Sequence, residues 1–123
     1  MQRLNLNLKT MATIKSYSDL QQSRKLAEIL PFESADMIYT MVNGRCTPFI
    51  RIETIEEMDE DDVLCWSLAA LLSVLPYPYI EQNYKGKWTC RVEHGNTTYL
   101  WEDSNPIDAC VAMVEKLNEL KML

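Results

Sequence analysis

The residues of this sequence that are able to do chemistry are few and widely spaced. His94 is the only histidine, so a serine–histidine or cysteine–histidine pair would have to use it. It stands beside Gly95 in a predicted turn, where nothing in the sequence indicates a partner to position it as a base. The sequence also contains no phosphate-binding glycine loop, zinc-protease motif or nucleophile elbow. We therefore expect a protein that is not an enzyme. The alternative that stays open is a catalytic site formed by residues that are distant in the sequence and meet only in the fold.

The four cysteines do not form a metal-binding pattern. Cys46, Cys65, Cys90 and Cys110 are far apart, and no two are separated by the two residues of a CxxC pair. A structural zinc site built from four cysteines usually takes its ligands in such close pairs. We expect no metal and no cofactor, and in a cytoplasmic chain we expect four reduced thiols.

An acidic run leads directly into an apolar stretch. Seven of the 18 acidic residues lie between Glu53 and Asp62, and residues 63–75 are almost wholly apolar up to Pro76. This pattern predicts a buried helix over 63–75, with Leu68 in the core and the acids in its solvated first turn. A weak Mg²⁺ or Ca²⁺ site and a charged docking surface stay open as alternatives. The EF-hand pattern is excluded, because its required Gly and Glu positions hold Leu64 and Ala70.

Outside this run the chain is close to neutral. The remaining eleven acids are nearly balanced by 12 Lys and Arg residues, and no basic patch stands out. Direct binding to nucleic acid is therefore not expected. No apolar run approaches the roughly 20 residues of a membrane-spanning helix, and the N-terminus lacks the apolar segment of a signal peptide. These features predict a cytoplasmic protein without membrane contact.

The aromatic residues suggest a binding surface more strongly than any other feature of the sequence. Trp88, Tyr99 and Trp101 share one predicted hairpin, and a tyrosine-rich connector precedes it. The simpler interpretation is packing in the core and between strands. The functional interpretation is a surface for a planar or anionic ligand, or for a partner protein, since Trp, Tyr and Arg are enriched at such sites. The candidate binding residues are Trp88, Arg91, Tyr99, Trp101 and Tyr79.

Capping and turn signals place the remaining elements. A capping-box pattern with Ser18 as the cap predicts a first helix that ends at Pro31. Asn43-Gly44 predicts a tight hairpin, and Pro48 predicts an edge strand or a bulge. A second hairpin turns at residues 94–96, and Asn105 followed by Pro106 predicts the start of the last helix.

These elements predict a single α+β domain over residues 1–123, in the order α-ββ-α-ββ-α. We expect the two hairpins to join in an antiparallel sheet packed on the buried central helix. Residues 1–15 are expected to be a flexible tail or a short added strand.

Three segments carry a resemblance: SADMIY (34–39), CWSLAALLSVLP (65–76) and NPIDACVAMVEKLNEL (105–120). In these segments the chain resembles a group of short, acidic proteins encoded by gut bacteria and their phages and prophages. No activity, cofactor or catalytic residue comes with the group. The resemblance implies a small accessory protein of phage origin, and residues 37–52 match the group least.

The function expected from the sequence is therefore binding rather than catalysis. The first hypothesis is an accessory or interaction protein that binds another protein or forms a homodimer. The edge strand near Pro48, the tyrosine-rich connector and the acidic run are the parts expected to supply its contact surface. The alternative is a protein that binds or sequesters a small planar or anionic ligand.

Overall fold

The computed structural model describes residues 15–51 and 58–123. Apart from Lys15, the predicted N-terminal tail or strand lies outside these residues. Glu53, Glu56 and Glu57 of the acidic run lie outside them as well. The predicted α+β class and the order of helices and hairpins are confirmed. The elements are α2 (Leu20–Ile29), the 3-10 turn η1 (Phe32–Ser34), β1 (Met37–Val42), β2 (Arg45–Ile50), β3 (Val63–Cys65), α3 (Leu68–Val74), β4 (Tyr79–Gln82), β5 (Trp88–His94), β6 (Thr97–Asp103) and α4 (Pro106–Glu119).

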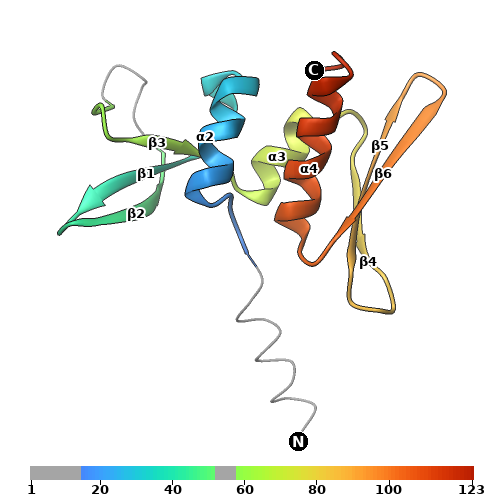
Figure 1. The fold of residues 1–123 in the computed structure, drawn as a ribbon, viewed down its shortest axis with the longest axis horizontal. Coiled ribbons are helices and arrows are strands. Elements are labelled where there is room, and N and C mark those ends of the chain that lie inside the picture. The colour runs from blue at the N-terminus through green and yellow to red at the C-terminus, as the bar shows by residue number, and fades with distance from the viewer. Residues whose placement is uncertain (1–14, 52–57) are drawn as a thin grey trace, which may run out of the picture.

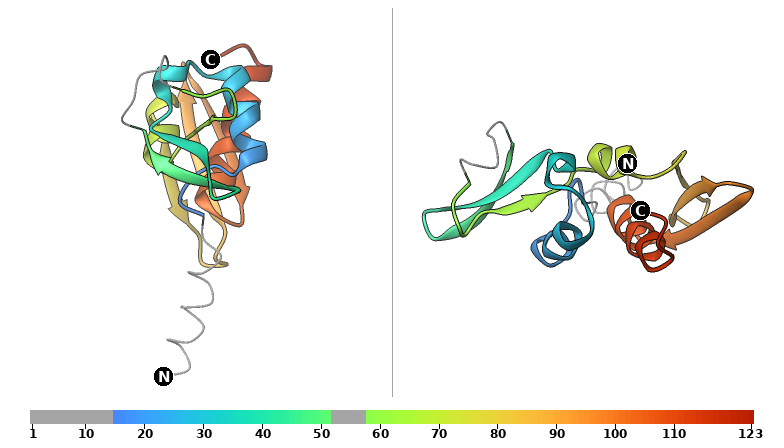
Figure 2. Two further views of the ribbon diagram at one scale, coloured as in Figure 1. Left: turned by 90° about the vertical axis from the view of Figure 1, so that its left-hand side faces the viewer. Right: turned by 90° about the horizontal axis from the view of Figure 1, so that it is seen from above.

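The strands form two antiparallel sheets, with the helices between them. The strand orders are β2-β1-β3 and β4-β5-β6, so the predicted hairpins do not join in one sheet. Figure 1 shows one sheet at each end of the molecule, and the views in Figure 2 confirm that the helices separate them. Each hairpin instead gains a short third strand, β3 or β4, from a segment that the sequence predicted as helix or connector.

The predicted helix over residues 63–75 is wrong at its start. Val63–Cys65 form β3 and pair with β1, and the helix begins only at Leu68. Ser67 caps α3, because its side chain accepts a hydrogen bond from the backbone N–H of Ala70. The acidic residues Asp59–Asp62 therefore precede a strand, and the expectation that they form the first turn of a helix is wrong as well.

The first hairpin forms as predicted. Asn43 and Gly44 have φ angles of 52° and 77°, the two left-handed conformations of a type I′ turn. This two-residue turn is closed by the hydrogen-bonded pair Val42–Arg45, so Pro48 falls opposite Tyr39 in a pair without hydrogen bonds. Pro48 therefore removes no hydrogen bond from the ladder and leaves the outer edge of β2 without a donor at its centre, as predicted for an edge strand.

The helix caps differ from the prediction at α2 and agree with it at α4. Asp19, not Ser18, caps α2 and forms the capping box with Gln22. Asn105 caps α4 as predicted, with Pro106 in its first turn.

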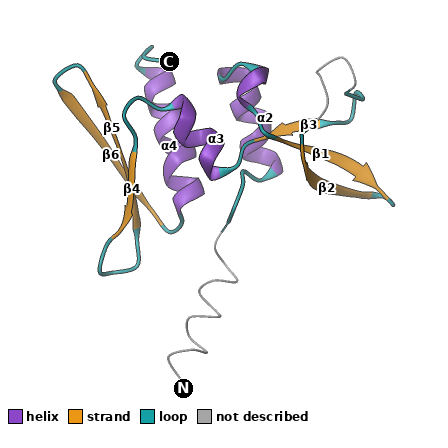
Figure 3. Cartoon of the chain, turned by 180° about the vertical axis from the view of Figure 1, so that it is seen from behind, coloured by secondary structure: helices purple, strands orange, loops and turns teal. Residues whose placement is uncertain are grey.

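Helix α4 is the most buried of the described helices. Figure 3 shows it beside α3, against the sheet β4-β5-β6. Its buried side chains belong to a core cluster that also includes Leu64 of β3 and Val92 of β5, so a single core joins the two sheets. The fully buried residues include Leu26, Trp66, Leu71, Cys90, Val92, Ile107, Cys110, Met113, Val114 and Leu117.

The position of α3 gives a test of this core. Leu71 is fully buried, whereas Leu68 is only partly buried at the start of the helix. We expect Leu71→Ala to lower the free energy of unfolding by about 3 kcal/mol, because it leaves a cavity. Leu68→Ala should cost about 1 kcal/mol, because much of its side chain stays in solvent. Urea denaturation measures both, and equal losses would contradict the assigned helix register.

Candidate protein-interaction surface

The structure does not bring the five predicted binding residues into one pocket. Trp88 and Trp101 lie on the face of the sheet β4-β5-β6 that packs on α4, together with Tyr99. Arg91 and Tyr79 lie opposite each other on the outer face, where the guanidinium carbon is 4.5 Å from the ring centre. Arg91 is therefore already stacked on a tyrosine and does not face the tryptophans. A binding role for these residues stays a prediction.

The other sequence candidates lie on the surface without a built site. His94 is the exposed last residue of β5, and no side chain of the described residues hydrogen-bonds to it. Asp59 and Asp62 close a short turn, in which the backbone N–H of Asp59 donates to the Asp62 carboxylate at 2.9 Å. Within residues 15–51 and 58–123, no three His, Cys, Asp or Glu side chains lie close enough together to hold a metal ion.

One face of the first sheet carries an apolar surface that the sequence did not reveal as a unit. The registers of β1 with β2 and of β1 with β3 put alternate residues of all three strands on the same side. We call this side the apolar hairpin face, and no charged side chain belongs to it. Its residues are Met37, Tyr39, Met41, Cys46, Pro48, Ile50, Val63 and Cys65.

The outer part of the apolar hairpin face is exposed. Ile50 on the edge strand β2 is 76% exposed and Met41 near the turn is 51% exposed, whereas Tyr39 on the central strand β1 is buried. Figure 1 shows the hairpin β1–β2 extending away from the helices, which leaves Met41 near its turn uncovered. Ile50 is exposed for another reason, because it lies at the end of the edge strand β2. Contiguous exposed apolar side chains of this kind are typical of sites that bind another protein.

A small hollow adjoins the base of this face. It has a volume of about 220 Å³ and is lined by Lys15, Ser16, Tyr17, Asp19 and Tyr39. The rings of Tyr17 and Tyr39 meet edge to face, with their centres 6.2 Å apart. The hollow therefore combines two aromatic rings with one positive and one negative side chain.

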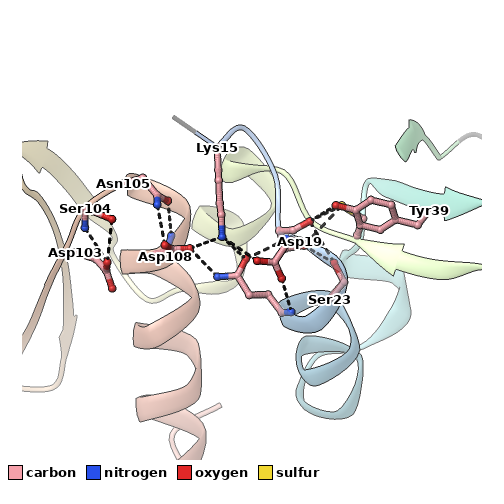
Figure 4. Close-up of polar contacts among 11 residues, drawn as sticks. Lys15, Asp19, Ser23, Tyr39, Asp103, Ser104, Asn105 and Asp108 are labelled. Atoms are coloured by element: carbon pink, nitrogen blue, oxygen red, sulfur yellow. Dashed lines mark hydrogen bonds and ion pairs between the residues drawn. The ribbon is translucent and has the colours of Figure 1, made fainter. Parts of the chain in front are cut away.

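The charged side chains at this hollow belong to a network that joins two helix N-termini (Figure 4). The Lys15 ammonium lies 2.9 Å from carboxylate oxygens of both Asp19 and Asp108. Gln22 donates to the same Asp108 oxygen at 2.7 Å, and Asn105 donates to the other oxygen at 2.7 Å. The two carboxylates therefore lie at the positive ends of the dipoles of α2 and α4, with Lys15 between them.

The network shifts the pKa values of its members. Partial burial alone would lower the pKa of Lys15, but hydrogen bonds to Asp19 and Asp108 outweigh it, so this pKa is raised. Burial alone would raise the pKa of Asp108, but hydrogen bonds from Lys15, Gln22 and Asn105 lower it below its ordinary value. All these donors and acceptors are engaged within the protein, so the arrangement fits a structural contact better than a catalytic pair.

A second polar cluster is fully enclosed. The hydroxyls of Ser18 and Ser23 are 2.7 Å apart, and the Tyr39 hydroxyl donates to the Ser18 carbonyl at 2.7 Å. Cys65 donates to the same carbonyl at 3.4 Å. Burial raises the pKa of the Cys65 thiol, and burial together with the neighbouring thiol raises the pKa of Tyr39. Neither group is poised as a nucleophile, because both stay protonated.

Two further thiols meet in the core. The Cys110 thiol donates to the Cys90 sulfur at 3.8 Å, and both side chains are fully buried. The hydrogen bond to Cys90, together with burial, raises the pKa of Cys110. Cys46 is the partly exposed cysteine and lies on the apolar hairpin face.

Comparison with known proteins gives no family for this chain. No protein-family model, no curated protein and no solved structure matches it. Within the described ranges, none of the helices has the length and apolar character needed to cross a membrane.

The sequence contained part of the signal for this site. The alternation of Met37, Tyr39 and Met41 was visible, and the Asn43-Gly44 turn fixes which residues of β2 join them. The contact of Lys15 with Asp108 had no local signal, because the two residues are 93 positions apart in the chain.

The Lys15–Asp108 contact predicts a pH dependence of stability. Because the folded pKa of Asp108 is lowered, its contribution is complete above the ordinary value of 3.8 and is lost as the pH falls below it. Asp108→Asn should cost about 1–2 kcal/mol at pH 7, and its deficit should shrink below pH 4. Glu119→Gln makes the same chemical change at an exposed position on α4 and should leave the profile unchanged. Thermal unfolding at several pH values measures this, and a deficit independent of pH would contradict the ion pair.

Thiol reactivity gives a second test. We expect iodoacetamide to modify Cys46 first in the native protein, since it alone among the four is partly exposed. Cys65, Cys90 and Cys110 should react only after denaturant is added, because all three are buried. Mass spectrometry of digested samples follows each site, and rapid modification of Cys90 or Cys110 without denaturant would contradict the packing.

Proposed function

We propose that this chain is a small, non-enzymatic interaction protein that binds another protein through the apolar hairpin face. The single observation that carries this proposal is the exposure of Ile50 and Met41 on a projecting hairpin, within a face that has no charged member. Removing such side chains from water stabilises a complex by roughly 25 cal/mol for each Å² buried.

The outer edge of β2 restricts the ways in which a partner protein can bind. Pro48 removes the central backbone donor from the outer edge of β2, so addition of a partner strand there is disfavoured. The partner is therefore expected to lie across the face, with its own apolar side chains against Met41 and Ile50. The exposed acids of the Asp59–Asp62 turn directly precede Val63 of the same face, and they favour basic groups at that border of the partner.

The wider setting of this proposal rests on the sequence. The resemblance to short proteins of gut bacteria and their phages supports an accessory role of phage origin in the cytoplasm. The hairpin is the segment that resembles this group least, which agrees with a partner specific to this protein. The absence of a basic patch in the sequence supports a protein partner over direct contact with nucleic acid.

Two neighbouring residues provide a matched pair of variants. Met41 and Val42 are both exposed, at 51% and 40%, but they point to opposite faces of the hairpin. Met41→Lys should weaken partner binding at least tenfold, because it places a charge in the exposed part of the apolar hairpin face next to the turn. Val42→Lys should bind like the wild type. Affinity purification of the full chain from its native host, followed by native mass spectrometry, measures retention of the partner.

The outcomes separate the two functional hypotheses. A partner chain retained by the wild type and Val42→Lys, and lost from Met41→Lys with unchanged melting temperature, supports the proposal. Equal retention by both variants would contradict the assigned surface. A small molecule retained without a partner chain would replace the interaction hypothesis with the ligand-binding alternative.

A further inference from the structure

The second sheet ends in an edge strand whose only charged residues, Glu102 and Asp103, lie at one end. Strand β6 spans Thr97–Asp103, lies at the end of the order β4-β5-β6, and contains neither Pro nor Gly. Natural edge strands are usually blocked by proline, lysine or a bulge, as Pro48 blocks β2. Strand β6 instead exposes Leu100 and Trp101, at 62% and 44%.

The turn determines which backbone groups of β6 point outward. The two-residue turn Gly95-Asn96 is closed by the hydrogen-bonded pair His94–Thr97. Hydrogen-bonded and non-hydrogen-bonded pairs alternate along the strands from this pair. The backbone N–H and C=O groups of Tyr99 and Trp101 are therefore hydrogen-bonded to β5. The outward N–H and C=O groups therefore belong to Thr98, Leu100 and Glu102. Within the described part of the chain, no backbone hydrogen bond outside the strand ladders uses these groups.

We propose that a second copy of this chain pairs with β6, antiparallel and with the two-fold axis at Leu100. In this register Leu100 faces Leu100 of the second copy, and Thr98 faces its Glu102. These are the residues with outward backbone groups, so about six hydrogen bonds form between the copies. The sheet β4-β5-β6 of one copy and the same sheet of the second copy then form one continuous six-stranded sheet.

The side chains of β6 are complementary to themselves in this register. Tyr99 faces Trp101 of the second copy in a close, non-hydrogen-bonded pair, and the two-fold axis makes this aromatic contact twice. The exposed Leu100 side chains meet on the outer face. Glu102 and Asp103 face threonines, so no two carboxylates lie directly opposite each other. The register therefore matches apolar with apolar and acid with hydroxyl along the whole strand.

The helices permit this arrangement. Helix α4 packs over both β5 and β6, so the two copies of α4 lie on the same face of the joined sheet. With strands about 4.8 Å apart, the axes of the two helices are about 10 Å apart. This spacing is within the ordinary range for packed helices, so the dimer contains a helix pair rather than a clash.

This inference is independent of the proposed function, because it uses the opposite end of the molecule from the apolar hairpin face. Figure 1 shows the hairpin β1–β2 and the strand β6 separated by the helices. The partner protein and the second copy therefore have separate surfaces, and Met41→Lys should leave the dimer intact.

A proline at position 100 tests the inference. Leu100→Pro removes the outward donor at the two-fold axis but no bond to β5, because Leu100 pairs with Arg91 without hydrogen bonds. The protein already tolerates this arrangement at Pro48 of β2. Sedimentation velocity should show a dimer for the wild type and at least a tenfold weaker dimer for Leu100→Pro. The control Leu100→Thr keeps the donor and should stay dimeric within a few-fold of the wild type.

Amide hydrogen exchange of the wild type provides a readout that needs no variant. The N–H groups of Thr98, Leu100 and Glu102 should be protected at high protein concentration and exchange quickly on dilution. Those of Tyr99 and Trp101 should be protected at both concentrations. A monomer up to millimolar concentration would overturn the inference. So would a dimer in which Thr98, Leu100 and Glu102 exchange quickly, because its contact would lie elsewhere.

Discussion

The fold depends on one fully buried residue, Ser18, in the segment that leads into α2. Its N–H donates to the Trp66 carbonyl at 2.9 Å, and its hydroxyl accepts from the Trp66 N–H at 3.1 Å. Its carbonyl accepts the hydroxyl proton of Tyr39 at 2.7 Å. One residue therefore joins the start of α2, the linker between β3 and α3, and the central strand of the first sheet. Because these groups are buried, losing any partner would leave a polar group without a hydrogen bond in the core.

This junction explains how two small sheets form one protein. A three-stranded sheet buries too little apolar surface on its own and has to pack against another element. The segment at Ser18 fixes the base of the first sheet to α2, and α4 covers the inner face of the second sheet. Trp66 is fully buried in the core that the two halves share. Its indole N–H donates a hydrogen bond to the Ser34 hydroxyl at 2.9 Å. The outer parts of both hairpins remain beyond the reach of the helices.

The surfaces proposed for binding follow from this geometry. The core covers only part of each sheet, so apolar side chains on the edge strands β2 and β6 stay exposed at both ends of the molecule. The contacts inside the body are fully satisfied: no buried side-chain nitrogen or oxygen among the described residues lacks a hydrogen-bond partner. Such a body is suited to presenting rigid surfaces, and its polar clusters are engaged in holding the elements together.

The sequence alone determined the features that depend on neighbouring residues. Asn43-Gly44 fixed the first turn, Asn105-Pro106 fixed the start of α4, and alternation placed Trp88, Cys90 and Val92 on one side of β5. Tertiary structure decided the features that depend on distant partners. Val63–Cys65 have the composition of a buried helix but become a strand because β1 offers them hydrogen-bond partners. Likewise, Asp19 caps α2 because the Ser18 hydroxyl accepts a hydrogen bond from the Trp66 N–H instead. Trp66 is 48 residues away, so no local sequence pattern indicates that contact. The apolar hairpin face lies between these cases, since the turn set its register but only packing decided which part of it stayed exposed.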